Sequence, residues 1–134
     1  MPAESTFRHR LRVYWEDTDA GGVVFYANYL KFFERARTEW LRALGFGQQQ
    51  LRQDTGAIFI VAATGVQYRL PARLDDVLDV TVAVREAGRA SMLIAQQAWR
   101  EHELLAEGDI RIGCVDAGTF RPTRIPTPIL DMLR

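Results

Sequence analysis

The chain has 134 residues, of which 48% are hydrophobic and 25% are charged, with 17 basic and 17 acidic side chains and a formal net charge of zero. This length suits one domain that buries its own core without disulfides or a structural metal. The neutral balance argues against nucleic acid as a partner, since a protein that follows phosphates needs a basic surplus. A small anionic ligand remains compatible with a local basic patch.

Cysteine content and apolar runs bear on the compartment. Cys114 is the only cysteine, so no intrachain disulfide can form, and the first ten residues lack the apolar core of a secretory signal. The longest uncharged stretch, residues 55–68, has 14 residues and two glycines. A membrane-spanning helix needs ~18 or more apolar residues. We therefore expect a cytoplasmic protein without a transmembrane segment.

The first half of the chain predicts one strand and one long helix. Apolar and polar side chains alternate over residues 7–16, as in a half-buried strand. Loop-forming residues follow, and then an apolar run that ends at Asn28, a residue typical of helix N-caps. Apolar side chains recur at spacings of three and four over residues 28–44, which predicts an amphipathic helix that ends before Gly45.

The second half is rich in β-branched and aromatic residues. It predicts a short helical turn at residues 48–54, then strands over residues 58–70, 77–86, 90–100 and 104–116, and an irregular tail from about residue 119 with a last turn at residues 129–133. The connections between the strands are short, which predicts antiparallel neighbours because a parallel crossover needs a dozen or more residues.

This order of elements predicts an α+β fold in one domain over residues 1–134. The long helix carries a stripe of large aromatic side chains, and only a curved sheet from the same chain could cover it. We therefore predict a hot-dog fold, in which a curved antiparallel sheet of about five strands wraps a long central helix. Such an open sheet leaves edge strands that pairing with a second copy protects, so we expect at least a dimer.

Several familiar catalytic and metal-binding patterns are missing. Neither serine, Ser5 nor Ser91, lies in a Gly-x-Ser-x-Gly motif, which argues against a serine hydrolase. His102 begins a sequence like a zinc-protease motif, but Ala106 stands where the second histidine is required. The sequence therefore predicts no metal site of this kind.

The loop after the first strand has the spacing Asp17-x-Asp19-x-Gly21, which partly matches a calcium loop. It lacks an oxygen ligand at the fifth position, Gly21, and the glutamate required at the twelfth, where Asn28 stands. We therefore reject calcium binding.

The same loop suits acyl transfer. Its two glycines let backbone approach a ligand closely, and the following helix start presents unpaired N–H groups to an oxyanion. Asp19 lies a few residues upstream, where a carboxylate could attack a carbonyl or activate a water. The alternative is that Asp17 and Asp19 only hydrogen-bond loop backbone, as turn aspartates commonly do.

Two motifs resemble a known family: YWEDTDAGGVVFYANY at residues 14–29 and FERARTE at residues 33–39. Both resemble the hot-dog acyl-CoA thioesterases of the 4-hydroxybenzoyl-CoA thioesterase type, and the bacterial Tol-Pal-associated branch most closely. The resemblance continues through residues 71–76 and 114–116, so it covers nearly the whole chain.

The resemblance implies metal-independent hydrolysis of an acyl-CoA thioester, with no cofactor because coenzyme A is part of the substrate. It implies Asp19 as the catalytic carboxylate, acting as base or nucleophile, and the backbone N–H of Tyr26 as oxyanion donor. Many Tol-Pal-branch members carry His where Tyr26 stands, a change that a backbone donor survives. Substrate contacts are implied for Gly22, and for Arg89 and Ser91 near the CoA nucleotide. The alternative for Arg89 is an arginine that is only solvated in its turn.

The family places its active site between subunits, so the resemblance also implies a homodimer or homotetramer. Two other functions stay open. One is a non-catalytic hot-dog scaffold with partners in the cell-envelope Tol-Pal system. The other is a dehydratase or hydratase, but such enzymes usually rely on a histidine with an acidic partner, and neither His9 nor His102 lies in the loop.

Overall fold

The computed structural model describes residues 6–133. In this part of the chain five strands form one antiparallel sheet: β1 (Phe7–Arg12), β2 (Ala57–Tyr68), β3 (Val77–Ala87), β4 (Ser91–Arg100) and β5 (Glu103–Asp116). The strand order is β1-β3-β4-β5-β2. Three α-helices accompany the sheet: α1 (Asn28–Ala43), α2 (Gln48–Thr55) and α3 (Thr127–Leu133). The predicted α+β hot-dog architecture is confirmed.

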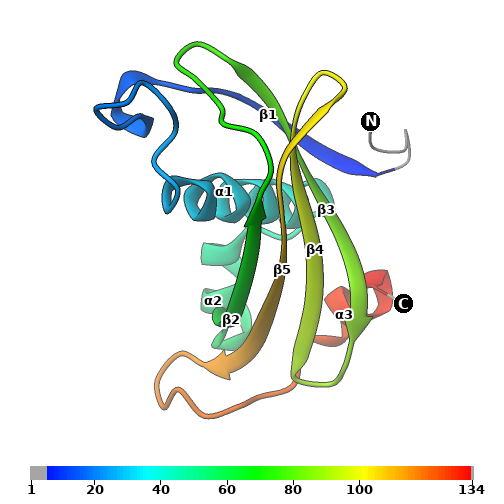
Figure 1. Cartoon of the computed structure of the whole chain (residues 1–134). Coiled ribbons are helices and arrows are strands. Elements are labelled where there is room, and N and C mark those ends of the chain that lie inside the picture. Colours follow the sequence, from blue (N-terminus) through cyan, green and yellow to red (C-terminus); the bar gives the residue numbers. More distant parts are fainter. Residues whose placement is uncertain (1–5, 134) are drawn as a thin grey trace.

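Helix α1 lies against the sheet, and the strands curve past it (Figure 1). Its buried side chains are Asn28, Tyr29, Phe32, Phe33, Ala36, Trp40 and Leu41. The sheet supplies alternate side chains of β4 and β5, such as Ile94 and Ile110, to the same core. Each large apolar side chain buried in this way stabilises the fold by about 1.5–3 kcal/mol, which is why the aromatic stripe fixes the helix on the sheet. None of the helices in residues 6–133 is both long and apolar enough to cross a membrane.

The prediction that short connections join antiparallel neighbours is correct for β4, which pairs with β3 and with β5. The prediction is wrong for β2 and β3, because β2 pairs with β5 at the opposite side of the sheet. Residues 69–76 cross the end of the sheet instead of turning back. Eight extended residues reach about 27 Å, farther than the roughly 14 Å across three strand spacings.

Two predicted boundaries around the first loop are also wrong. Strand β1 ends at Arg12 and not near residue 16, because the Asp17 carboxylate accepts the Tyr14 N–H at 2.8 Å and the chain turns into a 3₁₀ turn, η1 (Trp15–Asp17). The N-cap of α1 is Ala27, and Asn28 is already helical. At the other end of α1, Gly45 has φ +100 and ends the helix as predicted.

Candidate active site

The loop between β1 and α1 is a small hairpin. The Asp19 N–H donates to the Val23 carbonyl at 2.9 Å, and the Phe25 N–H donates to the Asp17 carbonyl at 3.0 Å. Thr18 and Val24 form an antiparallel β-bridge between these two bonds. The returning arm is tied to the β2–β3 loop, because the Val24 N–H donates to the Ala72 carbonyl at 2.8 Å. The hairpin is therefore held at the end of the sheet where β1 ends and β3 begins.

Asp17 fixes this hairpin to the helix. Its side chain is buried, with 4% of its surface exposed. One carboxylate oxygen accepts the Tyr14 N–H at 2.8 Å, and the other accepts the Asn28 side-chain amide at 2.7 Å. Both hydrogen bonds go to a charged acceptor, which makes them stronger than neutral ones. Asp17 therefore has the structural role that was the alternative to catalysis, because it hydrogen-bonds within the loop. Asn28 donates its side-chain amide to Asp17 and does not cap α1.

Asp19 lies at the tip of the hairpin, and its side chain is exposed. One of its carboxylate oxygens accepts the Gly21 N–H at 2.8 Å. A Cβ at Gly21 would come within 3.1 Å of that oxygen, so the glycine leaves room for this turn. Gly22 has φ +79, and a Cβ there would meet nothing within 4 Å. A glycine at position 22 adopts this left-handed backbone conformation without strain, and the space beside it is open.

The start of α1 supplies hydrogen-bond donors. The Phe25 carbonyl accepts the Asn28 N–H at 2.8 Å, and within a trans peptide the next N–H points the opposite way, so the Tyr26 N–H points away from the helix. Among the described residues the N–H of Tyr26 has no acceptor. In the hairpin Asp19 lies opposite Val23. Tyr26 is three residues beyond Val23, or about 10 Å along the backbone at roughly 3.3 Å per residue.

A pocket of about 270 Å³ lies beside Tyr26. Its lining residues are Val24, Tyr26, Tyr29, Tyr68, Arg69, Leu70 and Pro71. The Tyr68 hydroxyl donates to the Tyr26 carbonyl at 3.0 Å, and the Tyr29 hydroxyl accepts the Ala72 N–H at 3.2 Å. Burial raises the pKa of Tyr68 above its ordinary 10.0, and neighbouring Tyr26 raises it further. The Tyr68 hydroxyl is therefore protonated at neutral pH and can donate a hydrogen bond.

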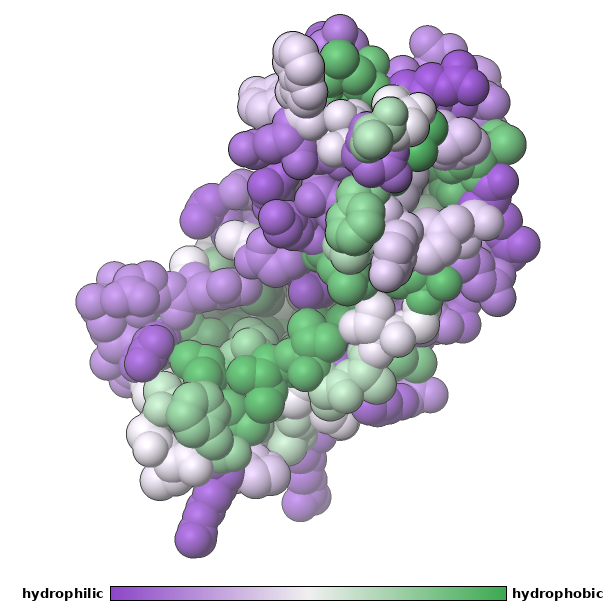
Figure 2. Space-filling model, turned by 60° about the vertical axis from the view of Figure 1, so that its left-hand side comes forward, coloured by the Kyte–Doolittle hydropathy of each residue, from purple (hydrophilic) through white to green (hydrophobic). Residues whose placement is uncertain are grey.

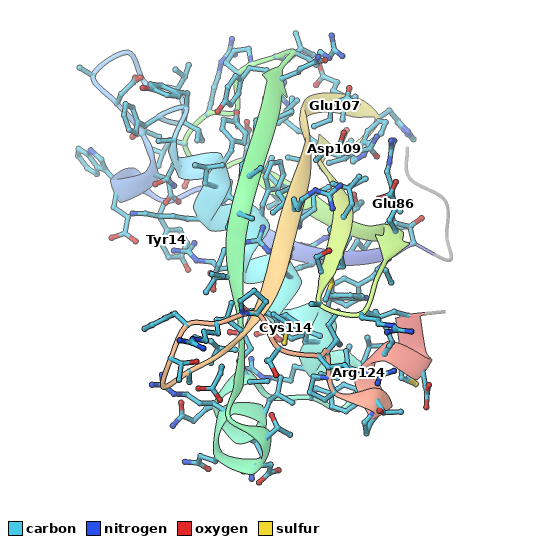
Figure 3. The ribbon with its side chains drawn as sticks, turned by 90° about the horizontal axis from the view of Figure 1, so that it is seen from below. Tyr14, Glu86, Glu107, Asp109, Cys114 and Arg124 are labelled. Carbon is cyan, nitrogen blue, oxygen red and sulfur yellow. The ribbon has the colours of Figure 1, made fainter. Side chains whose placement is uncertain are left out.

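Asp19 itself does not line this pocket, and in the single chain its carboxylate faces solvent. A larger hollow, of about 490 Å³, lies over the sheet and is lined by Arg85, Glu107 and Asp109 among others. Figure 3 labels Glu107 and Asp109 close together there. That hollow is outside the hairpin, so we do not assign the site to it.

Arg89 and Ser91 lie at the other end of the sheet. Ser91 is the first residue of β4, and Arg100, at the end of that strand, donates to the Pro71 carbonyl beside the hairpin. β4 has ten residues, so its ends are about 30 Å apart at ~3.3 Å per residue. A single chain therefore does not bring Arg89 or Ser91 next to Asp19.

The exposed turn that carries Arg89 has a second arginine beside it. The Ile125 N–H donates to the Arg89 carbonyl at 2.7 Å, so the tail runs along the turn and brings Arg124 near it. Figure 3 shows Arg124 beside Cys114, whose thiol lies 3.8 Å from the Arg124 carbonyl. Within residues 6–133 neither guanidinium has an ion-pair or hydrogen-bond partner.

Two participants were not singled out by the sequence, Tyr68 and Arg124. The hydrogen bond between Asp17 and Asn28 was not predicted either, although each residue was considered for another role. Tyr68 is 42 residues from Tyr26 along the chain, and only the folded sheet joins them. Within the described residues no three metal-ligating side chains cluster in a way that could hold an ion.

Comparisons with known proteins show the family and the fold of the chain. Residues 13–133 match the thioesterase-like superfamily. An acyl-CoA thioesterase YbgC of Haemophilus influenzae is 42% identical over 126 residues, 94% of this chain and 93% of that protein. An acyl-CoA thioester hydrolase YbgC of Escherichia coli is 42% identical over 125 residues, 92% of each chain. A crystal structure of a probable thioesterase from Bartonella henselae superposes with a TM-score of 0.85 at 29% identity, covering 91% of this chain and all of that one. With a match over residues 13–133 and these relatives, the chain belongs to the thioesterase-like superfamily.

Proposed function

We propose that this protein hydrolyses acyl-CoA thioesters to a free acid and coenzyme A, with Asp19 and the Tyr26 N–H acting on the thioester group. One observation carries the proposal: a donor without an acceptor at the start of α1 lies on the same short hairpin as an exposed carboxylate. Relatives 42% identical over most of the chain are named as acyl-CoA hydrolases, which supports the same substrate class.

In the proposed reaction, water attacks the thioester carbonyl carbon while the Asp19 carboxylate takes the water proton. The tetrahedral oxyanion accepts the Tyr26 N–H. The carbon–sulfur bond then breaks, and the proton on Asp19 goes to the leaving CoA thiolate. Removing an oxyanion donor of this kind typically costs ~3 kcal/mol, or about two orders of magnitude in rate. The reaction requires no metal.

A second route has the same products. The Asp19 carboxylate itself attacks the carbonyl and expels the thiolate, forming a mixed anhydride that water then hydrolyses. A single turnover in ¹⁸O water tests for the anhydride. Label that appears in the Asp19 carboxylate requires the anhydride route, because the base route places the water oxygen in the acid product alone.

The active unit that we propose is a dimer joined through β2. This strand is at the edge of the sheet, and its outer edge has no partner within the described chain. Ile60 and Val61 are exposed on it, Val61 to 51%. Figure 2 looks at this side of the molecule, and hydrophobic side chains gather in its lower half. A long apolar edge strand invites pairing with another chain.

Pairing two copies of β2 antiparallel explains how the separated site residues act together. A two-fold axis through such a pair sets the Ala57 end of one β2 beside the Tyr68 end of the other. The turn with Arg89 of the partner subunit would then approach the hairpin of the first chain. Arg89 and Ser91 would bind the CoA nucleotide there, with Arg124 adding a second guanidinium for its phosphates. The second copy would also cover the solvent-facing Asp19.

The proposal is tested by thiol release from a panel of short, long and aromatic acyl-CoA esters. We expect turnover of at least one ester by the wild type. Asp19→Asn should keep the fold and the oligomeric state but lose most of the turnover. Asp131→Asn is a matched control, since Asp131 is an exposed carboxylate on α3, outside the site. A near-wild-type rate of Asp19→Asn on a good substrate would defeat the assignment.

A further inference from the structure

The carbonyl group of Tyr26 is not satisfied by helix α1. The Leu30 N–H, which could reach back to it, donates to the Ala27 carbonyl at 3.2 Å. Among the described residues the hydrogen bond from the Tyr68 hydroxyl, at 3.0 Å, is the one that the Tyr26 carbonyl accepts. The orientation of the Tyr26–Ala27 peptide therefore depends on a side chain of the sheet.

Tyr26 thus lies between two anchored peptides. On one side the Phe25 carbonyl accepts the Asn28 N–H at 2.8 Å, and on the other the Tyr26 carbonyl accepts the Tyr68 hydroxyl. The first of these peptides carries the Tyr26 N–H, and the second is joined to it through φ and ψ of Tyr26. Anchoring both peptides therefore restricts these two soft torsions together. An oxyanion donor stabilises the transition state only when it is already aimed at the developing charge.

The ring of Tyr68 makes contacts of its own, apart from the hydrogen bond of the hydroxyl. It lies 5.4 Å from the Tyr29 ring and 6.3 Å from the Tyr26 ring, the latter edge to face. All three rings line the pocket of about 270 Å³ beside the donor. The strand holds this arrangement, because Tyr68 pairs with Ala106 at the last rung between β2 and β5.

We propose that Tyr68 is a positioning residue for the oxyanion donor: its hydroxyl holds the peptide that follows Tyr26 and so limits rotation of the adjoining peptide that carries the Tyr26 N–H, while its ring forms a wall of the acyl pocket. This inference rests on the proposed function. It predicts that the hydroxyl affects kcat and the ring affects KM, a division that a merely structural tyrosine would not produce.

The test compares two variants with the wild type. Tyr68→Phe keeps the ring and removes the hydroxyl, and we expect kcat to fall about tenfold while KM stays within twofold. Tyr68→Ala removes the ring as well, and KM should then rise in addition. Replacing Tyr68 by p-aminophenylalanine, which retains a donor at the same place, should restore kcat.

A matched control separates positioning from general loss of stability. The buried Thr81 hydroxyl accepts the Gln97 N–H at 3.0 Å in the middle of the sheet, away from the hairpin. Thr81→Val removes this hydrogen bond and should lower the melting temperature without changing kcat. In the NMR spectrum of Tyr68→Phe, the Ala27 amide resonance should move because its own peptide loses the hydrogen bond, while that of Asp116 at the far end stays.

Three results would overturn the inference: a kcat of Tyr68→Phe within twofold of wild type, an equal loss of kcat in Thr81→Val, or no recovery with p-aminophenylalanine. Any of them could occur while Asp19→Asn still abolishes turnover, and the proposed function would then stand alone. If Asp19→Asn turned over normally, the proposed function would fail first.

Discussion

Asp17 and Asp19 are two residues apart, and the structure gives them different tasks, so the same substitution should affect them differently. Asp17→Asn replaces a buried acceptor of two hydrogen bonds by a group with one oxygen and one NH₂. The amide can still accept either the Tyr14 N–H or the Asn28 side-chain amide, but its NH₂ then faces the other donor. A buried donor without an acceptor costs about 1–3 kcal/mol, so we expect a loss of ~2 kcal/mol in the free energy of unfolding.

Asp19→Asn should cost less than about 0.5 kcal/mol, because its remaining oxygen can still accept the Gly21 N–H at an exposed position. For a chain of this size, a loss of ~2 kcal/mol lowers the melting temperature by roughly 6–12 °C. The measurement is urea and thermal unfolding by circular dichroism, at one fixed protein concentration because assembly affects stability. Equal stability of Asp17→Asn and wild type would refute the role given to the buried carboxylate.

The remaining predictions concern the hairpin, the thiol and the interface. Gly22→Ala should lose about 1–2 kcal/mol in urea unfolding, because φ +79 is strained for a residue with a Cβ; an unchanged midpoint would contradict this. Ala27→Pro should retain thiol release, since the N–H it deletes is not the assigned donor and φ −69 at Ala27 suits proline; inactivity would move the donor to Ala27. Burial raises the pKa of Cys114 above its ordinary 9.0, so the folded state keeps its proton longer than the unfolded state. Stability from this thiol is therefore complete below its ordinary pKa of 9.0 and is lost as pH rises above it, whereas Cys114→Ala should not show this loss in urea unfolding at alkaline pH. Val61→Lys on the β2 edge should shift light scattering toward the monomer and lower turnover together, and an active monomer would contradict the dimer site.

The architecture could be predicted because it depends on local periodicity. Phe32, Phe33, Ala36 and Trp40 recur at helical spacing, and all four are among the residues that α1 buries. The position of β2 could not be predicted in the same way. It pairs with β5 and not with β3, and the loop between β2 and β3 is tied to the first hairpin by the bond between Val24 and Ala72, which joins segments far apart in the sequence.

The candidate site was predicted in part. Composition and turn residues place Asp19 and the helix start on one loop, but they do not distinguish Asp19 from Asp17. That distinction comes from burial, since only Asp17 lies under the hairpin with two donors aimed at it. Tyr68 has no local signal at all, because its partner is a backbone carbonyl across the fold. The scaffold alternative with envelope partners stays a prediction.

The most direct test of the account is a subunit-mixing measurement. Asp19→Asn and Arg89→Ala chains are purified separately, mixed in equal amounts under conditions that let the subunits exchange at random, and assayed for thiol release at substrate concentrations below KM. If each site takes Asp19 from one chain and Arg89 from the partner subunit, a heterodimer contains one intact site, and random mixing should recover about a quarter of the wild-type rate. If both residues served a site within one chain, mixing would give only the average of the two parent variants, and that result would contradict the account.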